Sequence, residues 1–299
     1  MLLLRSSQML QTLEGALRKG IPESLKIYGT IFHMNRGNPF KLEALVDRWP
    51  DFRTVIVRPP EQDMTDDLDH YTNTYQVFSK DFQNCQEILK SSDVINWKQH
   101  LQIQGKNVMH LKNQSRSRRH TRYLYLISET MKKHAPSQQN LDQLYTKTEK
   151  PKTKVNTEIY KMSSLEPQHA SLVNDLWSFG GNERSLKFIQ RCIQGDTSVL
   201  ELMDQTGELR MAGTLPEYRR QGLISHIIYQ HIQDMDKIEY PVYSHIAKDN
   251  LHAQEISHSL KLIRATYYWQ QWNCEPLRGS ALKESESQSK REGGSGGRA

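Results

Sequence analysis

An acid, a short alternating segment and an arginine-glycine cluster stand close together in "GELRMAGTLPEYRRQGL", residues 207–223. From Glu208 to Leu215 polar and apolar side chains roughly alternate, which predicts a strand. Gly213 and Pro216 near its end are unusual for a central strand. We therefore expect a strand whose end diverges from its neighbour, so that a ligand can lie alongside with its reactive end near Glu208.

The cluster that follows predicts the start of a helix. Leu223, Ile224 and the apolar residues after them recur at helical spacing, and the cluster before them is Arg219, Arg220, Gln221 and Gly222. Free backbone N–H groups and the positive end of the helix dipole meet there, and Gly222 allows close approach to the backbone. This pattern is typical of a pyrophosphate site. The same residues would also be found at an ordinary helix start that binds no anion, with a loop glycine and two surface arginines.

The helices and strands that must position these residues can be predicted from the spacing of apolar side chains along the chain. We predict helices over 9–17, 38–49, 167–177 and 182–194 and from Asn250 onward, with strands over 25–34, 52–59, 158–165, 240–246 and 262–272. A polar segment around Pro151 marks a boundary between domains 1–150 and 156–277. Residues 278–299, rich in Ser, Gly and charge, are expected to be a disordered tail.

Composition bounds the class of protein. The 299 residues are 36% hydrophobic and carry a formal net charge of +6, which suits a globular protein with anionic partners. No run is long enough for a membrane span. The three cysteines are far apart, without metal-ligand spacing, which indicates free thiols and no metal site. The basic run over 112–122 is read as a solvated loop before a strand rather than a nucleic-acid site, whose sign would be steeply salt-dependent binding.

The first twenty residues allow two interpretations. They contain no acid before Glu14 and carry Arg5, Arg18 and Lys19, as a matrix-targeting helix would. Met9, Leu10, Leu13 and Leu17 also form one apolar stripe, which an ordinary first helix of the fold would show equally.

Several long segments resemble the glycine N-acyltransferase family of the GNAT superfamily. They are "GNPFKLEALVDRWPDF", "DDLDHYTNTYQVFS", "VINWKQHLQIQ", "GGNERSLKFIQRCIQ", "MDQTGELRMAGTLPEYRRQGL", "PVYSH" and "WNCEPL". The resemblance covers most of residues 1–277. It implies an α/β (α+β) protein of two GNAT-like domains, each a mixed, mostly antiparallel sheet flanked by helices.

The resemblance also implies an activity. Acyl-CoA would be a co-substrate rather than a bound cofactor, and its acyl group would pass to glycine by direct attack, with Glu208 as general base. The acyl-CoA loop would be Arg219, Arg220, Gln221, Gly222, Leu223 and Ile224, and Asn250 would hold the pantetheine arm unless it serves only as a helix N-cap. We expect a monomer in the mitochondrial matrix, acting in detoxification by amino acid conjugation, with neither nucleic acid nor membrane as partner.

The chain departs from the family pattern in two internal places. About ten residues are missing near 194–202, where a strand and hairpin are expected, and residues 105–121 are shorter than and dissimilar to the family. Losing a core strand leaves backbone groups unpaired. The alternative function is therefore a catalytically impaired acyl-CoA-binding relative or splice form. Glutamine or another amino acid also remains open as the acceptor.

Overall fold

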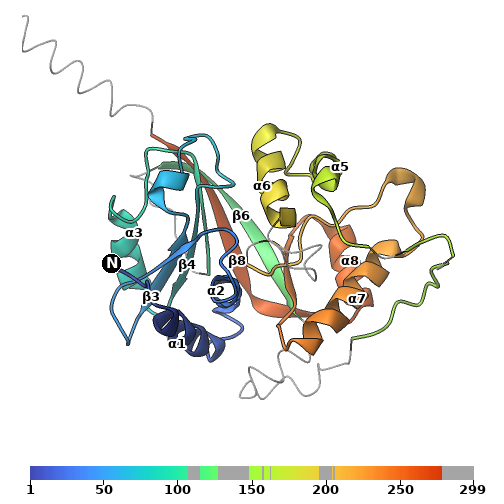
Figure 1. Ribbon diagram of the computed structural model, residues 1–299, viewed down its shortest axis with the longest axis horizontal. Helices are drawn as coiled ribbons and strands as arrows, with labels where there is room; N and C mark the ends of the chain where they lie inside the picture. The colour runs from blue at the N-terminus through green and yellow to red at the C-terminus, as the bar shows by residue number, and fades with distance from the viewer. Residues whose placement is uncertain are drawn as a thin grey trace, which may run out of the picture.

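The computed structural model describes residues 1–106, 115–126, 148–156, 158–161, 163–194, 204 and 206–277. Its described strands form one mixed sheet with helices on both faces (Figure 1). The order is β1-β2-β3-β4-β5-β8-β6-β7, and every described pair of neighbours except β4 with β5 is antiparallel. The mostly antiparallel sheet flanked by helices that the family resemblance implied is confirmed.

The elements have the following bounds. The strands are β1 Leu2–Leu3, β2 Glu43–Val46, β3 Thr54–Arg58, β4 Thr74–Ser79, β5 Leu101–Gly105, β6 Ser115–Leu126, β7 Tyr243–Ala247 and β8 Ile263–Pro276. The α-helices are α1 Ser7–Arg18, α2 Leu25–Met34, α3 Phe82–Lys90, α5 Ala170–Leu176, α6 Glu183–Gln194, α7 Leu223–Lys237 and α8 Leu251–Ser259. Single turns of 3₁₀ helix lie at Glu61–Asp63, Pro167–His169 and Pro216–Tyr218.

The long strands β6 and β8 run through the middle of the molecule and connect its two halves (Figure 1). β8 pairs with β5 from Leu101↔Cys274 onward and with β6 from Ser115↔Pro276 onward, so the C-terminal strand lies between two strands from the first half of the chain. The division into domains 1–150 and 156–277 stays a prediction. Hydrogen bonding of the sheet nevertheless continues across that boundary.

The first half of the chain is a sheet covered on both faces. Val55 and Val57 of β3 point toward α1 and α2, whereas Ile56 points toward α3. All of β3 is buried as a result, as predicted for 52–59. The helix predicted over 9–17 is also confirmed as α1, which buries Leu13 and Leu17 in this core. The N-terminal segment is thus an integral helix of the fold, as the second of its two interpretations expected.

Two predictions in this half were wrong. Residues 25–34 form helix α2 rather than a strand, and all ten of its side chains are buried. A helix buried on every side has no polar face, so its sequence cannot be told from a buried strand by periodicity. Residues 38–49 contain strand β2 rather than a helix. Asn38 has a φ of 48° and closes a turn by pairing with both backbone groups of Leu42, so it is no N-cap.

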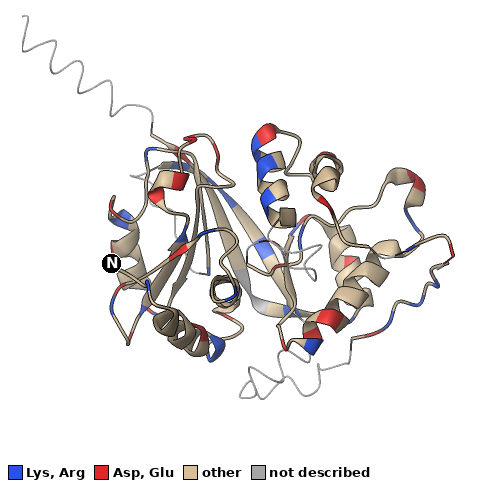
Figure 2. Ribbon diagram, viewed as in Figure 1, with Lys and Arg blue, Asp and Glu red and all other residues tan. Residues whose placement is uncertain are grey.

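The second half follows prediction more closely. Helices α5, α6, α7 and α8 and strands β7 and β8 lie where periodicity expected them. The strand over 158–165 is absent among the described residues of that segment, which are turns and irregular chain. The basic run over 112–122 is no loop, because its described part lies in β6. In Figure 2 the ribbon is blue, for Lys and Arg, at several positions along β6 and α6. The predicted deletion near 194–202 and the tail 278–299 lie outside the described residues.

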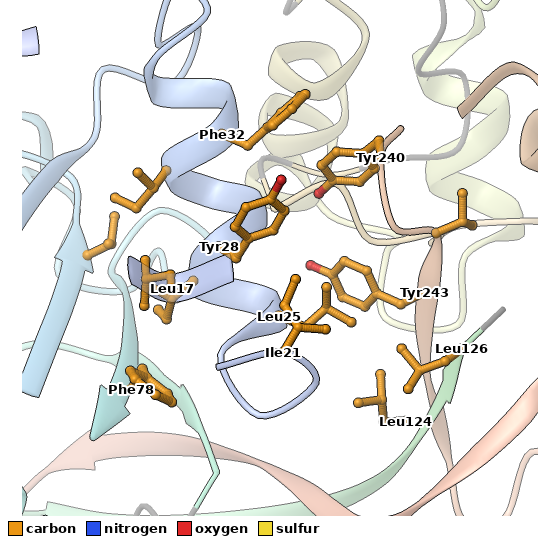
Figure 3. Close-up of a cluster of buried hydrophobic side chains, with 14 of the residues drawn as sticks. Leu17, Ile21, Leu25, Tyr28, Phe32, Phe78, Leu124, Leu126, Tyr240 and Tyr243 are labelled. Carbon is orange, nitrogen blue, oxygen red and sulfur yellow. The ribbon is translucent and has the colours of Figure 1, made fainter. Parts of the chain in front are cut away.

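The core between the two halves is aromatic where α2 meets the second half of the chain. Figure 3 shows Tyr28 and Phe32 of α2 beside Tyr240, with Tyr243 nearby. The ring centroids of Phe32 and Tyr240 are 4.7 Å apart. The hydroxyls of Tyr240 and Tyr243 both donate to the carbonyl oxygen of Thr206, at 3.0 and 2.6 Å. These bonds satisfy buried polar groups and hold the 204–208 turn against α2.

Candidate functional site

The segment after Glu208 meets β7 briefly and then leaves it. Glu208 forms a parallel bridge with Tyr243, and the amide of Leu209 donates to the carbonyl oxygen of Tyr243 at 2.9 Å. Beyond this point the expected strand over 208–215 is absent, and the backbones separate. A cavity of about 670 Å³ opens between them, lined by Ala212–Thr214 on one side and by Ser244 and Ile246 on the other. The predicted divergence is therefore present, although the strand is reduced to a bridge.

The N-terminus of α7 forms one end of this cavity. Gly222 is its N-cap with a φ of 74°, a left-handed conformation that favours glycine. The predicted residues that line the cavity are Arg219, Arg220, Gly222, Leu223, Ile224 and Asn250. The helix start thus faces the cavity with free N–H groups, as an anion site requires.

Two predicted residues have additional or different roles. Gln221 is not in the cavity wall, and its side-chain oxygen accepts a hydrogen bond from the Tyr160 hydroxyl at 2.6 Å. Asn250 lines the cavity and also caps α8, since its side chain accepts from the amide of Ala253 at 3.1 Å. The helix-cap interpretation of Asn250 is therefore confirmed, and its contact with a pantetheine arm stays a prediction.

Glu208 lies beneath the point of divergence and is only 2% exposed. Its carboxylate forms an ion pair with Lys26 of α2, which is equally buried. The other oxygen accepts from the amide of His245 at 3.0 Å, and the Nδ1 atom of that histidine lies 3.2 Å from the carboxylate. Glu208 is therefore held by one residue from each half of the molecule, and it does not line the large cavity itself.

A glycine in α2 allows this arrangement. A Cβ atom at Gly29 would overlap the Thr206 carbonyl oxygen and the Tyr240 hydroxyl. Its absence allows α2 to approach the 204–208 turn closely enough for Lys26, one turn earlier, to reach Glu208. Lys26 and His245 were not predicted as site residues. A lysine inside the apolar segment 25–34 is a signal that could have suggested a buried ion pair.

The surroundings of Glu208 fix its charge. Burial by itself raises the pKa of a carboxyl group, but Lys26 and His245 oppose it and hold the pKa of Glu208 well below its usual value. Burial lowers the pKa of His245. At neutral pH the pair is therefore a carboxylate beside a neutral imidazole. An ionised carboxylate is the form that can accept a proton.

A second, smaller hollow of about 80 Å³ adjoins the large cavity, because Arg210 lines both. Arg210 forms an ion pair with buried Asp204 at 2.8 Å. The walls of the hollow come from both halves of the molecule: His70, Tyr71, Gln102, Gln104, Arg122, Trp177, Phe188 and Gln271 are among them. Within the described ranges no cluster of His, Cys, Asp and Glu could hold a metal ion, and no helix could cross a bilayer.

Substitution of Gly222 tests the anion site. In Gly222→Ala the new Cβ would lie 2.9 Å from the Thr153 side chain and would strain a backbone at positive φ. We expect the Kd for CoA to rise at least about tenfold while the acceptor KM stays unchanged, because the substitution affects only the predicted pyrophosphate contact. Titration calorimetry with CoA measures this. Gly181→Ala is the control, since its φ is also positive but it has open space. An equal loss of affinity in both variants would contradict the assignment.

Comparison with known proteins gives consistent results over residues 1–276. Residues 1–195 match the family model of the aralkyl acyl-CoA:amino acid N-acyltransferases, and residues 192–276 match the model of their C-terminal region. A glycine N-acyltransferase from Bos taurus is 52% identical over 297 residues, covering 93% of this chain and all of the relative. A glycine N-phenylacetyltransferase from Bos taurus is 52% identical over 92% of this chain and 99% of its own length.

The human glycine N-acyltransferase is 51% identical over 93% of this chain and all of its own length. A solved Drosophila protein is similar in fold, with a TM-score of 0.65 at 14% identity over 91% of this chain and 97% of its own. The family models divide near residues 192–195, about forty residues after the predicted boundary at 150.

Proposed function

Because the chain belongs to the aralkyl acyl-CoA:amino acid N-acyltransferase family, we propose that it transfers the acyl group of an acyl-CoA to the amine of glycine, giving an N-acylglycine and CoA. Relatives with half their residues in common are named glycine N-acyltransferases, and one is named a glycine N-phenylacetyltransferase. Benzoyl-CoA and phenylacetyl-CoA are accordingly the donors of choice for a first assay.

The observation that carries this proposal is the cavity between residues 209–214 and β7, with the start of α7 at its end. A helix N-terminus with two arginines suits a pyrophosphate, and the narrow space between two diverging backbones suits an extended pantetheine arm. The thioester would then lie near the Glu208–Tyr243 bridge, beside the second hollow. Arg219, Arg220, Gly222, Leu223, Ile224 and Asn250 would bind the donor.

We assign Glu208 the role of general base. Only the free amine attacks a thioester, and the nitrogen must lose a proton as the C–N bond forms. The nitrogen attacks the carbonyl carbon, the carboxylate accepts the proton that the nitrogen loses, the C–S bond breaks, and CoA leaves as the thiolate. Transfer of that proton from the carboxyl group to the sulfur, directly or through solvent, gives the CoA thiol and restores the carboxylate. His245 donates its backbone N–H to the carboxylate and Lys26 pairs with it, so both act as positioning residues.

The test is mass-spectrometric detection of the N-acyl product from purified protein, benzoyl-CoA or phenylacetyl-CoA, and glycine, with glutamine as a competing acceptor. Formation of N-acylglycine with release of CoA thiol supports the proposal. Tight CoA binding without any product would instead indicate the impaired relative. Preferential acylation of glutamine would support the proposed reaction but show that glutamine, not glycine, is the acceptor.

We further propose that the protein acts in the mitochondrial matrix. The ground is the family resemblance, because the N-terminal segment, although free of acids before Glu14, is accounted for as helix α1 of the core. We expect a C-terminally tagged chain to co-localise with a matrix marker in fluorescence microscopy. Diffuse cytosolic fluorescence would contradict this.

A further inference from the structure

Buried charges near Glu208 form pairs, with one exception. Lys26 pairs with Glu208, and Arg210 pairs with Asp204. Arg122 of β6 is only 8% exposed, yet its side chain makes no hydrogen bond or ion pair with any part of the chain that the structure describes, and its Nε atom is buried without a partner. The carboxylates of Glu208 and Asp249 act on Arg122 only at a distance. A buried cation without a directly paired counter-ion is costly, so its position indicates an anionic ligand.

The position of Arg122 is next to the proposed chemistry. Arg122 lies opposite Ala247 of β7. Ala247 is two residues after His245, so the side chains of Arg122 and His245 are on the same face of the sheet. Its guanidinium rests over the ring of Phe179, 5.1 Å from the ring centroid, and lines the small hollow together with Arg210. Burial and the neighbouring Arg210 lower the pKa of Arg122 to about 10, so the side chain stays charged at neutral pH.

A second unpaired group lines the same hollow. The side-chain amide of Gln104 donates to Gln102 at 3.0 Å, but its oxygen is buried without a hydrogen-bond partner among the described residues. The hollow therefore contains a cationic donor and a neutral acceptor, and neither is satisfied. A molecule that carries a carboxylate and an amine is complementary to both.

The walls of the hollow limit what can bind. Its volume is about 80 Å³, and Arg122, Phe179 and Asn273 also line a larger, more open cavity of about 960 Å³. The rings of Tyr71, Trp177 and Phe188 are among its walls. In an α-amino acid one carbon separates the carboxylate from the amine, so a site that fixes the carboxylate also fixes the nucleophile.

We propose that Arg122 binds the carboxylate of the acceptor amino acid, that the oxygen of Gln104 accepts a hydrogen bond from its amine, and that the aromatic walls restrict the acceptor to glycine or a similarly small amino acid. This inference rests on the proposed function. The inference places the acceptor amino acid in the small hollow, which Arg210 separates from the large cavity.

The test compares glycine with glycinamide, which keeps the amine and lacks the carboxylate. In Arg122→Gln we expect the KM for glycine to rise roughly 10- to 100-fold, because hydrogen bonds to a charged group are lost. The KM for acyl-CoA and the turnover of glycinamide should stay within about threefold of the parent. Arg122→Lys keeps the charge without the paired N–H donors and should give a smaller rise for glycine.

Arg119→Gln is the matched control, since it makes the same change at an exposed position on the other face of β6. It should leave both acceptors unaffected. Equal losses for glycine and glycinamide in Arg122→Gln would show a merely structural role and overturn the inference. If Arg122→Gln fails to fold, Arg122→Lys provides the test. The inference would be overturned if the rate with glycine relative to the rate with glycinamide were the same in Arg122→Lys as in the parent. Failure of the parent to acylate any amine would be a failure of the proposed function instead.

Discussion

Glu208→Gln is expected to lower kcat by about 10²–10⁴-fold at neutral pH, with the Kd for acyl-CoA unchanged. The amide keeps the size of the side chain but cannot accept the proton, and the residues proposed to bind the donor line the large cavity, which Glu208 does not. The loss should become smaller as pH rises, because more of the acceptor amine is already deprotonated. Initial rates across pH, with acyl-CoA affinity measured separately by calorimetry, test this expectation.

The same substitution also removes half of a buried ion pair. Leaving Lys26 charged and unpaired should lower the free energy of unfolding by about 3–5 kcal/mol, so loss of activity alone would not identify a base. The double variant Lys26→Met, Glu208→Gln removes both charges and should recover most of the stability but none of the activity. Recovery of activity together with stability would show that Glu208 acts only as a structural partner of Lys26.

The contribution of the Lys26–Glu208 ion pair to stability also depends on pH, and the direction of that dependence can be predicted. Since the pKa of Glu208 is lower in the folded protein than in the unfolded chain, its contribution to stability is fully present above the unfolded-state value of about 4.3. That contribution disappears as pH falls below this value and through the folded-state pKa. The pair therefore stabilises the link between the two halves throughout the physiological range.

The sequence was most informative where local signals coincide with the final structure. Gly222 at positive φ, Asn250 as a cap and the apolar stripe of α7 are local features, and the proposed acyl-donor site rests on them. The diverging backbone was also anticipated from Gly213 and Pro216, although the strand itself is absent.

The acceptor end could not be predicted in this way, because its residues meet only through long-range contacts. Lys26, Arg122 and Gln104 are far from Glu208 in sequence, and each lies in an element whose setting is decided by packing. The basic run over 112–122 predicts a solvated loop that includes Arg122, and only the pairing of β6 with β7 shows that this arginine is buried. Charge count along the chain cannot distinguish an exposed arginine from a buried one.

Gly29→Ala and Gly15→Ala are expected to change stability in opposite directions, although both replace a glycine inside a helix. Gly15 of α1 has open space around the position of a Cβ atom, so alanine should raise the free energy of unfolding by about 0.5–1 kcal/mol through helix propensity. At Gly29 the new methyl group would overlap the Thr206 carbonyl oxygen and the Tyr240 hydroxyl. We expect a net loss of about 1–3 kcal/mol, because α2 must move away from the turn.

The substitution at Gly29 should also change the geometry around Glu208. The methyl group displaces the 204–208 turn from α2, and Lys26 and Glu208 then no longer meet in the same geometry. We therefore expect Gly29→Ala to lower kcat as well as stability, whereas Gly15→Ala should leave kcat unchanged. Urea unfolding and initial rates on the two purified variants measure both quantities. If the two alanines stabilise the protein equally, then α2 does not pack against the turn, and the proposed positioning of Glu208 by the first half of the chain is wrong.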